Sequence, residues 1–199
     1  MKLSTTAFVL IGYQNDYFSS NGILRSAIEE SASTTNALEN TMALLARLAP
    51  TGATLIQTPI IFTPTYEELV EPVGILKVIR DVGAFQDGQP GSEVIPEFNQ
   101  YGDRIRTITG KRGLNAFSNT MLNNVLAENK IETVVVAGAV TSVCIDSTAR
   151  SAHEKGYSVV VLEDCTAGRS DFEQQFYCEQ IFPLYASVMS STDILEALT

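Results

Sequence analysis

Four largely apolar runs of strand length constrain the fold of this chain more than any other feature. They lie at residues 7–12 (AFVLIG), 54–62 (TLIQTPIIF), 132–137 (ETVVVA) and 157–162 (YSVVVL). A strand with one face in water alternates apolar and polar residues, whereas strands buried on both faces of a parallel sheet are apolar along their length. The runs therefore predict strands inside a parallel sheet.

Helical patterns separate these runs. Residues 33–48, 119–129 and 142–155 place apolar side chains at a mostly 3.6-residue spacing, and the last segment ends at Gly156, as a capped helix does. Alternating strands and helices predict right-handed βαβ units. We therefore expect a Rossmann-like three-layer α/β/α fold with a mainly parallel central sheet, in which sites lie at the carboxyl ends of the strands.

The length of 199 residues suits a single domain over residues 1–199. Residues 63–106 are rich in proline and glycine and interrupt the alternation, so we predict a long excursion that forms one wall of a pocket; a plain surface connection is the alternative. The net charge of −10 disfavours nucleic acid and anionic membranes as partners, because both would be repelled. A small-molecule substrate fits this surface better.

The three cysteines, Cys144, Cys165 and Cys178, cannot all pair with one another, and a chain of this size needs no disulfides for stability. The first residues contain a short apolar run without a small-residue cleavage site. No segment reaches the roughly 20 apolar residues of a membrane span. We therefore expect a cytoplasmic protein.

Cys144 lies where a strand gives way to a helix. In VVVAGAVTSVCIDSTARSAHEKGY, a buried strand ends at Gly138 and the first turn of the next helix contains the cysteine. Thr141 or Ser142 can cap that helix, and the positive end of a helix dipole favours a thiolate. Cys144 is thus a candidate nucleophile, although a cysteine here can also be a small buried apolar residue.

Lys111 is the candidate partner of Cys144. It lies in TGKRGLNAF, after a short predicted strand at residues 104–109, so it can reach the sheet edge where Cys144 is expected. A nearby ammonium would hold the thiol ionised by charge pairing. The alternative is a solvated loop lysine.

Two blocks of this sequence resemble the signatures of isochorismatase-like hydrolases. The family patterns are K-x-x-x-[SN]-A-F and G-x-x-T-x-x-C-[VI]-x-x-T-A. The matching residues here are Lys111, Asn115, Ala116, Phe117, Gly138, Thr141, Cys144, Ile145, Thr148 and Ala149. The opening IGYQNDYF also resembles the family's I-D-x-Q-N-D-F, and DGQPGSEVIPEF resembles its middle segment.

The resemblance implies a Rossmann-like fold, assembly as a homodimer or homotetramer, and an amidase chemistry in which Asp, Lys and Cys cooperate. Cys144 would attack an amide carbonyl and form a thioester that water then hydrolyses. The resemblance also implies a cis peptide between Ala139 and Val140, and an oxyanion hole made by the N–H groups of Val140 and Cys144. The implied pocket residues are Gly12, Tyr13, Gln14, Ala139 and Phe117.

One position departs from the family pattern. The family's catalytic Asp follows the first strand, where this chain has Gly12, and glycine can neither take the thiol proton nor deliver it to a leaving amine. Asp16 is the candidate replacement; the alternative is that it holds the loop in place. If Asp16 does not serve, an Asp restored at position 12 is expected to raise amide hydrolysis.

The same departure bears on the substrate. Isochorismatases proper use that Asp to protonate a vinyl ether, so isochorismatase activity itself is not expected. His153 is the sole histidine, which excludes the His-built metal site of nicotinamidases. We therefore expect neither a metal nor a cofactor.

These residues predict a cysteine hydrolase that cleaves a C–N bond of a small amide or carbamoyl-type compound through a thioester on Cys144. The alternative is a catalytically silent or redox-sensing member of the fold that binds a ligand or partner, for which Gly12 is the main support.

Overall fold

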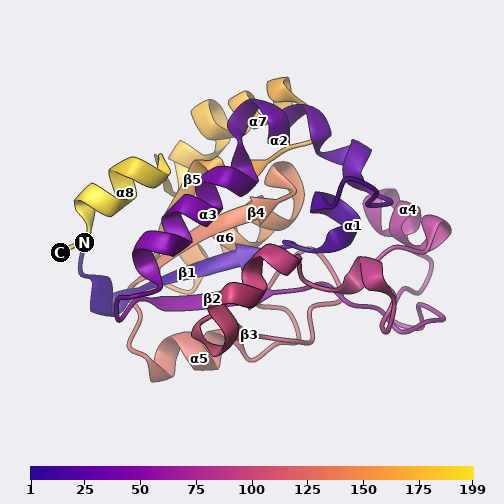
Figure 1. Cartoon of the computed structure of the whole chain (residues 1–199), viewed down its shortest axis with the longest axis horizontal. Coiled ribbons are helices and arrows are strands. Elements are labelled where there is room, and N and C mark those ends of the chain that lie inside the picture. Colours follow the sequence, from indigo (N-terminus) through magenta and orange to yellow (C-terminus); the bar gives the residue numbers. More distant parts are fainter.

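The computed structural model describes residues 1–199 and contains one six-stranded sheet in the order β3-β2-β1-β4-β5-β6 (Figure 1). The strands are β1 (Thr6–Ile11), β2 (Thr54–Thr58), β3 (Arg106–Thr107), β4 (Thr133–Ala139), β5 (Ser158–Ala167) and β6 (Ser187–Met189). All neighbouring strands are parallel. The predicted α/β class and parallel sheet are confirmed.

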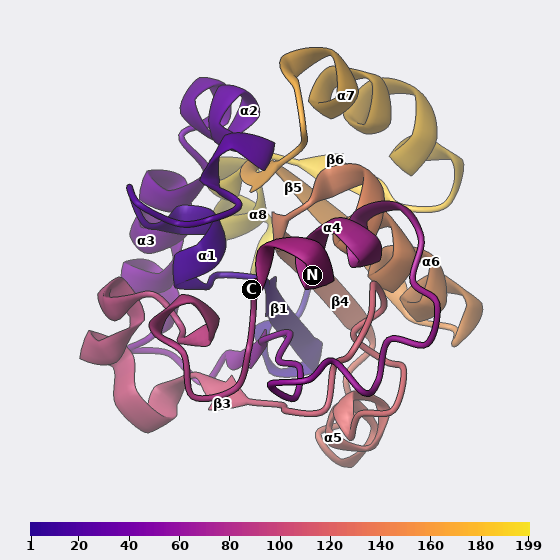
Figure 2. The same cartoon turned by 90° about the vertical axis from the view of Figure 1, so that its right-hand side faces the viewer.

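Helices cover both faces of the sheet. They are α1 (Asn15–Phe18), α2 (Glu29–Thr35), α3 (Ala37–Leu48), α4 (Gly74–Val82), α5 (Leu122–Glu128), α6 (Asp146–Glu154), α7 (Asp171–Phe176) and α8 (Ser191–Ala197). Figure 2 shows α2, α3 and α8 on one face and α5 and α6 on the other. Along β1, Phe8 and Leu10 belong to one apolar core, while Val9 and Ile11 belong to the second. This two-sided burial explains why the strand is apolar throughout.

The strand order reverses between β1 and β4. From β1 the chain proceeds outward to β2 and β3, and it then returns to place β4 on the other side of β1. Such a reversal opens a crevice at the carboxyl ends of the two strands. Ile11 pairs with Gly138 in this register, and a Cβ on Gly138 would lie 1.8 Å from the Ile11 carbonyl oxygen, so only glycine permits the approach. Gly12 and Ala139 therefore meet at the crevice.

Several elements are shorter than their patterns predict, among them β3, which covers only Arg106–Thr107 of the strand predicted at residues 104–109. β2 ends at Thr58 instead of continuing to residue 62, because Pro59 has no N–H for the ladder; only isolated bridges, such as Ile60 with Lys111, follow it. The predicted helix at residues 33–48 is divided between α2 and α3 by Asn36, which has a left-handed φ of +51°. Asparagine adopts this conformation more readily than most residues.

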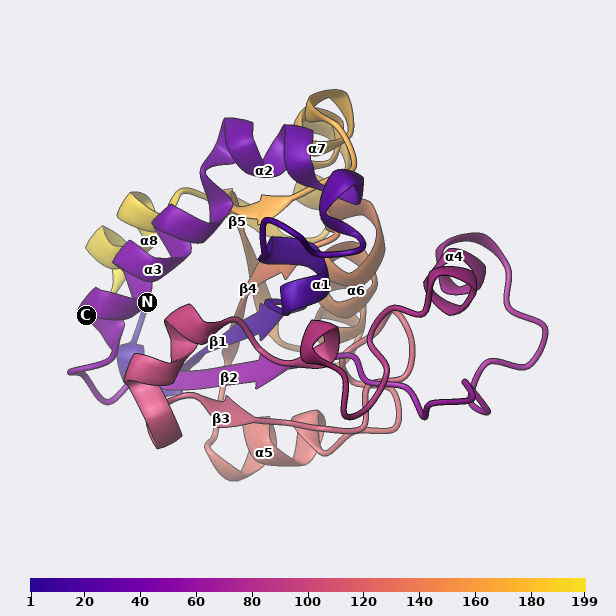
Figure 3. The same cartoon turned by 45° about the vertical axis from the view of Figure 1, so that its right-hand side comes forward.

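The long excursion contains α4, and the part around α4 projects from the body of the molecule (Figure 3). Ile75 of α4 lines a cavity together with residues of α6 and α7, as expected of a pocket wall. No helix of the chain combines the length and the apolar character that crossing a membrane requires.

Candidate active site

The turn that follows β4 carries Cys144. A cis peptide joins Ala139 to Val140, as the family resemblance implies, and a π-helical turn over Thr141–Ile145 leads into α6. The Cys144 side chain is buried, with 6% of the residue exposed. The sequence thus correctly predicted a cysteine in the first helical turn at the sheet edge.

The expected helix cap is absent. Neither Thr141 nor Ser142 caps the turn; the Thr141 hydroxyl instead donates to Oε1 of the buried Gln174. Nε2 of Gln174 in turn donates to the Glu163 carbonyl oxygen and to the Thr166 hydroxyl. Gln174 therefore ties the nucleophile turn to β5, a role that nothing in the local sequence indicates.

Lys111 lies against Cys144. Its Nζ is 3.6 Å from the Cys144 Sγ and donates a hydrogen bond to the Gly113 carbonyl oxygen at 2.5 Å. The residue is 1% exposed and takes part in none of the ion pairs of the structure. The bridge to Ile60, beyond β2, holds Lys111 at this edge. The solvated loop lysine is excluded, and the predicted proximity of the two side chains is confirmed.

One backbone N–H group in the turn that leads to Cys144 has no hydrogen-bond partner. The Val140 N–H makes no hydrogen bond within the chain, although Val140 itself is fully buried. Nearly all buried N–H groups are paired, so an unpaired one beside a nucleophile is suited to receive a negatively charged oxygen.

Gly12 has a backbone conformation that favours glycine. Its φ is +72°, and a Cβ at this position would lie 2.9 Å from the Ala139 carbonyl oxygen and 3.7 Å from Cδ2 of Tyr17. The missing carboxylate therefore cannot be restored by a change of side chain alone. Gly12→Asp can raise hydrolysis only if the backbone at residue 12 shifts, and that expectation stays a prediction.

We expect Gly12→Asp to lower the free energy of unfolding by about 1–3 kcal/mol, because the left-handed φ and the close carbonyl both strain the new side chain. Chemical denaturation of the wild type, Gly12→Ala and Gly12→Asp tests this. Gly12→Ala should show a similar loss, since the strain begins at Cβ. Unchanged stability in both variants would contradict the strain argument.

Asp16 supports a loop. Its Oδ2 accepts the Phe85 N–H at 2.6 Å, and a Cβ on Gly91 would lie 2.1 Å from Oδ1, so the carboxylate is enclosed by the excursion. Burial raises the pKa of Asp16, although hydrogen bonds from the Phe85 and Ile23 N–H groups lower it in part. The geometry argues against Asp16 as the replacement base and favours the loop-holding alternative.

Asp16→Asn is expected to lower the free energy of unfolding by about 1–3 kcal/mol at acidic pH, because an amide cannot reproduce both accepted bonds, and by less near neutral pH. The raised pKa means that the folded state holds the Asp16 proton to higher pH than the unfolded state does. The Asp16 contribution is therefore greatest below the ordinary pKa of about 3.9 and is lost as pH rises through the folded-state pKa. Urea unfolding of both proteins across pH 4 to 7 measures this. A stability difference independent of pH would contradict it.

The other predicted pocket residues lie as follows. The Tyr13 hydroxyl bonds with the Thr41 hydroxyl and the Cys165 carbonyl oxygen, inside the core. The Gln14 amide bonds with backbone groups of Ile60 and Ser92. Phe117 stacks on Tyr157 at a centroid distance of 6.3 Å.

The side chains of Tyr13, Gln14 and Phe117 are therefore engaged by other parts of the chain. Gly12 and Ala139 meet at the crevice itself, through backbone atoms.

The other two cysteines differ from Cys144. Burial raises the pKa of Cys178 to about 12, with help from the charges of Glu163 and Glu179. Burial likewise raises the pKa of Cys165 well above its ordinary value. Both remain thiols near neutral pH, which favours selective reaction at Cys144.

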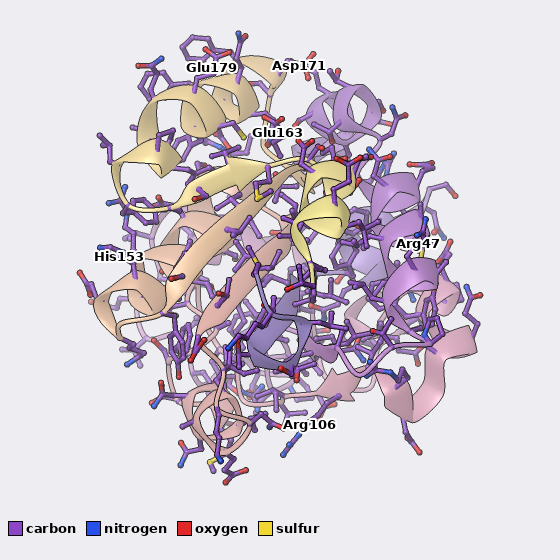
Figure 4. All side chains as sticks on the ribbon, turned by 90° about the vertical axis from the view of Figure 1, so that its left-hand side faces the viewer. Arg47, Arg106, His153, Glu163, Asp171 and Glu179 are labelled. Carbon is purple, nitrogen blue, oxygen red and sulfur yellow. The ribbon has the colours of Figure 1, made fainter.

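Two cavities flank this region. One of about 670 Å³ opens beside the nucleophile turn at Ser142 and Val143. Another, of about 580 Å³, is lined by acidic side chains that include Glu163, Asp171 and Glu179, which Figure 4 shows near one another. The lining of the first cavity thus includes the two residues that precede Cys144 in the turn.

His153 lies on the outer surface of the molecule (Figure 4). No group of three or more His, Cys, Asp or Glu side chains is arranged to hold a metal ion.

Comparison with known proteins agrees with this geometry. The model of the isochorismatase domain matches residues 6–193. The chain belongs to the isochorismatase family. An isochorismatase family protein of Bacillus subtilis (strain 168), YddQ, is 30% identical over 168 residues, which cover 82% of this chain and 78% of the relative. Family membership makes the chain a hydrolase.

Further relatives extend the comparison. The isochorismatase-family chain is 28% identical to a ureidoacrylate amidohydrolase, RutB, of Cronobacter sakazakii, over 96% of this chain and 88% of that protein. The crystal structure of an N-carbamoylsarcosine amidase from Thermoplasma acidophilum is similar in fold, with a TM-score of 0.73 and 24% identity over 96% of this chain and 97% of that chain.

Proposed function

We propose that this isochorismatase-family chain hydrolyses a C–N bond of a small amide or carbamoyl-type compound, with Cys144 as the nucleophile. The observation that carries the proposal is the 3.6 Å approach of the Lys111 ammonium to the Cys144 sulfur in a buried crevice. The amidohydrolase and the amidase among the similar proteins agree with this reaction class.

In the first half-reaction, the Cys144 thiolate attacks the carbonyl carbon while Lys111 holds the proton as an ammonium. The new C–S bond displaces the carbonyl electron pair onto oxygen. The N–H groups of Val140 and Cys144 are proposed to stabilise that oxyanion, typically by about 3–4 kcal/mol per donor. The C–N bond then breaks, and the leaving nitrogen takes its proton from Lys111.

In the second half-reaction, water attacks the thioester carbonyl and gives a proton to the neutral Lys111 amine. The C–S bond breaks, the acid leaves, and the thiolate and ammonium are restored. This assignment uses Lys111 as the proton carrier because the Asp16 carboxylate is engaged by Phe85 and position 12 carries none.

A hydrolysis screen over small amides and carbamoyl compounds, repeated after stoichiometric treatment with iodoacetamide, tests the proposal. We expect Cys144 to be labelled faster than a free cysteine and activity to fall in proportion, with Cys165 and Cys178 unlabelled. Full activity in protein alkylated at Cys144 would exclude the mechanism. Absence of hydrolysis, with labelling no faster than that of a free thiol, would favour the silent, ligand-binding alternative that Gly12 suggests.

We also propose that the chain forms a homodimer or homotetramer. The projecting excursion carries exposed apolar side chains at Val70, Val73 and Val78. Apolar side chains exposed together are typical of association surfaces. Sedimentation velocity at micromolar concentration should show an oligomer, and a monomer alone would contradict this.

A further inference from the structure

Tyr17 is a buried tyrosine whose hydroxyl has no partner. Three tyrosines are no more than 6% exposed: Tyr13, Tyr17 and Tyr66. The Tyr13 hydroxyl bonds within the core, and the Tyr66 hydroxyl donates to the Ala84 carbonyl oxygen. Tyr17 is 3% exposed and forms no side-chain hydrogen bond. The side-chain polar atoms that are both fully enclosed and without a partner are Gln57 Oε1 and Thr58 Oγ1, so the Tyr17 hydroxyl oxygen is not fully enclosed. The hydroxyl therefore opens onto a space.

Tyr17 lies at the same edge of the sheet as Cys144, since its ring contacts the position that follows β1 and Cys144 lies in the turn that follows β4. The Tyr17 ring lies 3.7 Å from the point that a residue-12 Cβ would occupy, at the crevice between β1 and β4. The charge of an ionised Cys144 raises the Tyr17 pKa, after the larger effect of burial, so the phenol and the sulfur lie within electrostatic reach. In the opening pattern I-D-x-Q-N-D-F, this chain differs at two of the named positions, with Gly12 for Asp and Tyr17 for Phe.

Compared with the family pattern, this segment of the chain loses a hydrogen-bond acceptor and gains a hydrogen-bond donor. A carboxylate at position 12 would accept hydrogen bonds, whereas the protonated Tyr17 phenol can donate one. The raised pKa keeps Tyr17 protonated at any physiological pH. The other polar groups at the thiol, the Lys111 ammonium and the Val140 N–H, are also donors.

We propose that the Tyr17 hydroxyl donates a hydrogen bond to the leaving group of the substrate, and so selects substrates that carry an acceptor atom beside the scissile nitrogen. Acylureas and imides have such an atom in their second carbonyl oxygen, whereas simple primary and alkyl amides do not. This inference rests on the proposed function, because the leaving side is defined by the attack of Cys144. It narrows the substrate class to compounds in which the scissile nitrogen bears a second acyl or carbamoyl group.

Selective alkylation of Cys144 tests this without a known substrate. Iodoacetylurea and N-isopropyliodoacetamide carry substituents with the same number of heavy atoms, but only the first places an acceptor oxygen beside the nitrogen. Both react in the same way: the sulfur forms a bond to the methylene carbon, the C–I bond breaks, and iodide leaves. Dividing each rate by the rate with glutathione removes the difference in intrinsic reactivity.

In the wild type we expect the normalised rate to favour iodoacetylurea by about 10-fold, the value of one hydrogen bond that would otherwise be lost. Tyr17→Phe keeps the ring and should bring the ratio close to one. Tyr101→Phe, whose hydroxyl makes one long bond to the Met42 carbonyl oxygen, is the matched control and should retain the wild-type ratio. Thermal unfolding of each variant shows whether it is folded.

A normalised ratio near one in the wild type, or an equal change for both reagents in Tyr17→Phe, would overturn the inference. A wild-type ratio near one overturns the inference even if the variant fails to fold. If Cys144 reacts no faster than free cysteine, but the ratio favours iodoacetylurea in the wild type and falls to one in Tyr17→Phe, the proposed hydrolysis fails while the Tyr17 contact stands.

Discussion

Cys144→Ala is expected to abolish hydrolysis, with a loss of at least about 1000-fold, because no other group of the crevice can form the covalent intermediate. The fold should survive. Alanine removes only the sulfur of a small side chain. The bond between Thr141 and Gln174 and the bond from the Ile145 N–H to the Val140 carbonyl oxygen still hold the turn. Turnover of the best substrate from the screen gives the activity, and thermal unfolding gives the stability.

Cys178→Ala is the matched control for this change. Cys178 is also a buried thiol, and it accepts a hydrogen bond from Gln174, but burial keeps it protonated and it lies outside the crevice. Its loss should lower stability slightly and leave turnover unchanged. Hydrolysis that survives in Cys144→Ala would refute the nucleophile.

Lys111→Met is expected to reduce hydrolysis by about 100- to 10,000-fold, the usual contribution of a positioned acid–base group. Methionine has a similar length and no charge, so it removes both the charge that pairs with the thiolate and the carried proton. The ammonium is almost fully buried with no carboxylate partner. Its removal should therefore leave stability unchanged or raise it.

This pair of effects separates catalysis from folding. Iodoacetamide labelling of Cys144 should slow together with hydrolysis, while the unfolding temperature stays level or rises. Lys155→Met is the control, since that lysine lies over the Phe117 ring, 5.6 Å from its centroid, away from the thiol. Equal turnover in Lys111→Met and the wild type would exclude Lys111 as the proton carrier.

The sequence alone determined the class of fold and the location of the candidate nucleophile. Two-sided burial favours apolar residues at every position of β1 and β4 after the first threonine, so both strands could be recognised as short apolar runs in the sequence. Because parallel strands all end at one edge, residues that follow them, such as Gly12 and Cys144, were expected near one another. The motif resemblance then identified Lys111 as the partner of Cys144.

Only the tertiary structure decided which polar side chains are free to act. Asp16, Tyr13 and Gln14 belong to one short segment, yet each is engaged by a backbone or hydroxyl group from a part of the chain more than 25 residues away. Tyr17, in the same segment, has no such partner. The sequence pattern predicts which residues lie near the end of a strand. Whether a carboxylate or a hydroxyl there finds a hydrogen-bond partner depends on segments that are distant in the sequence. That is why the sequence located the crevice of this protein, and its packing determined which polar side chains there are already engaged.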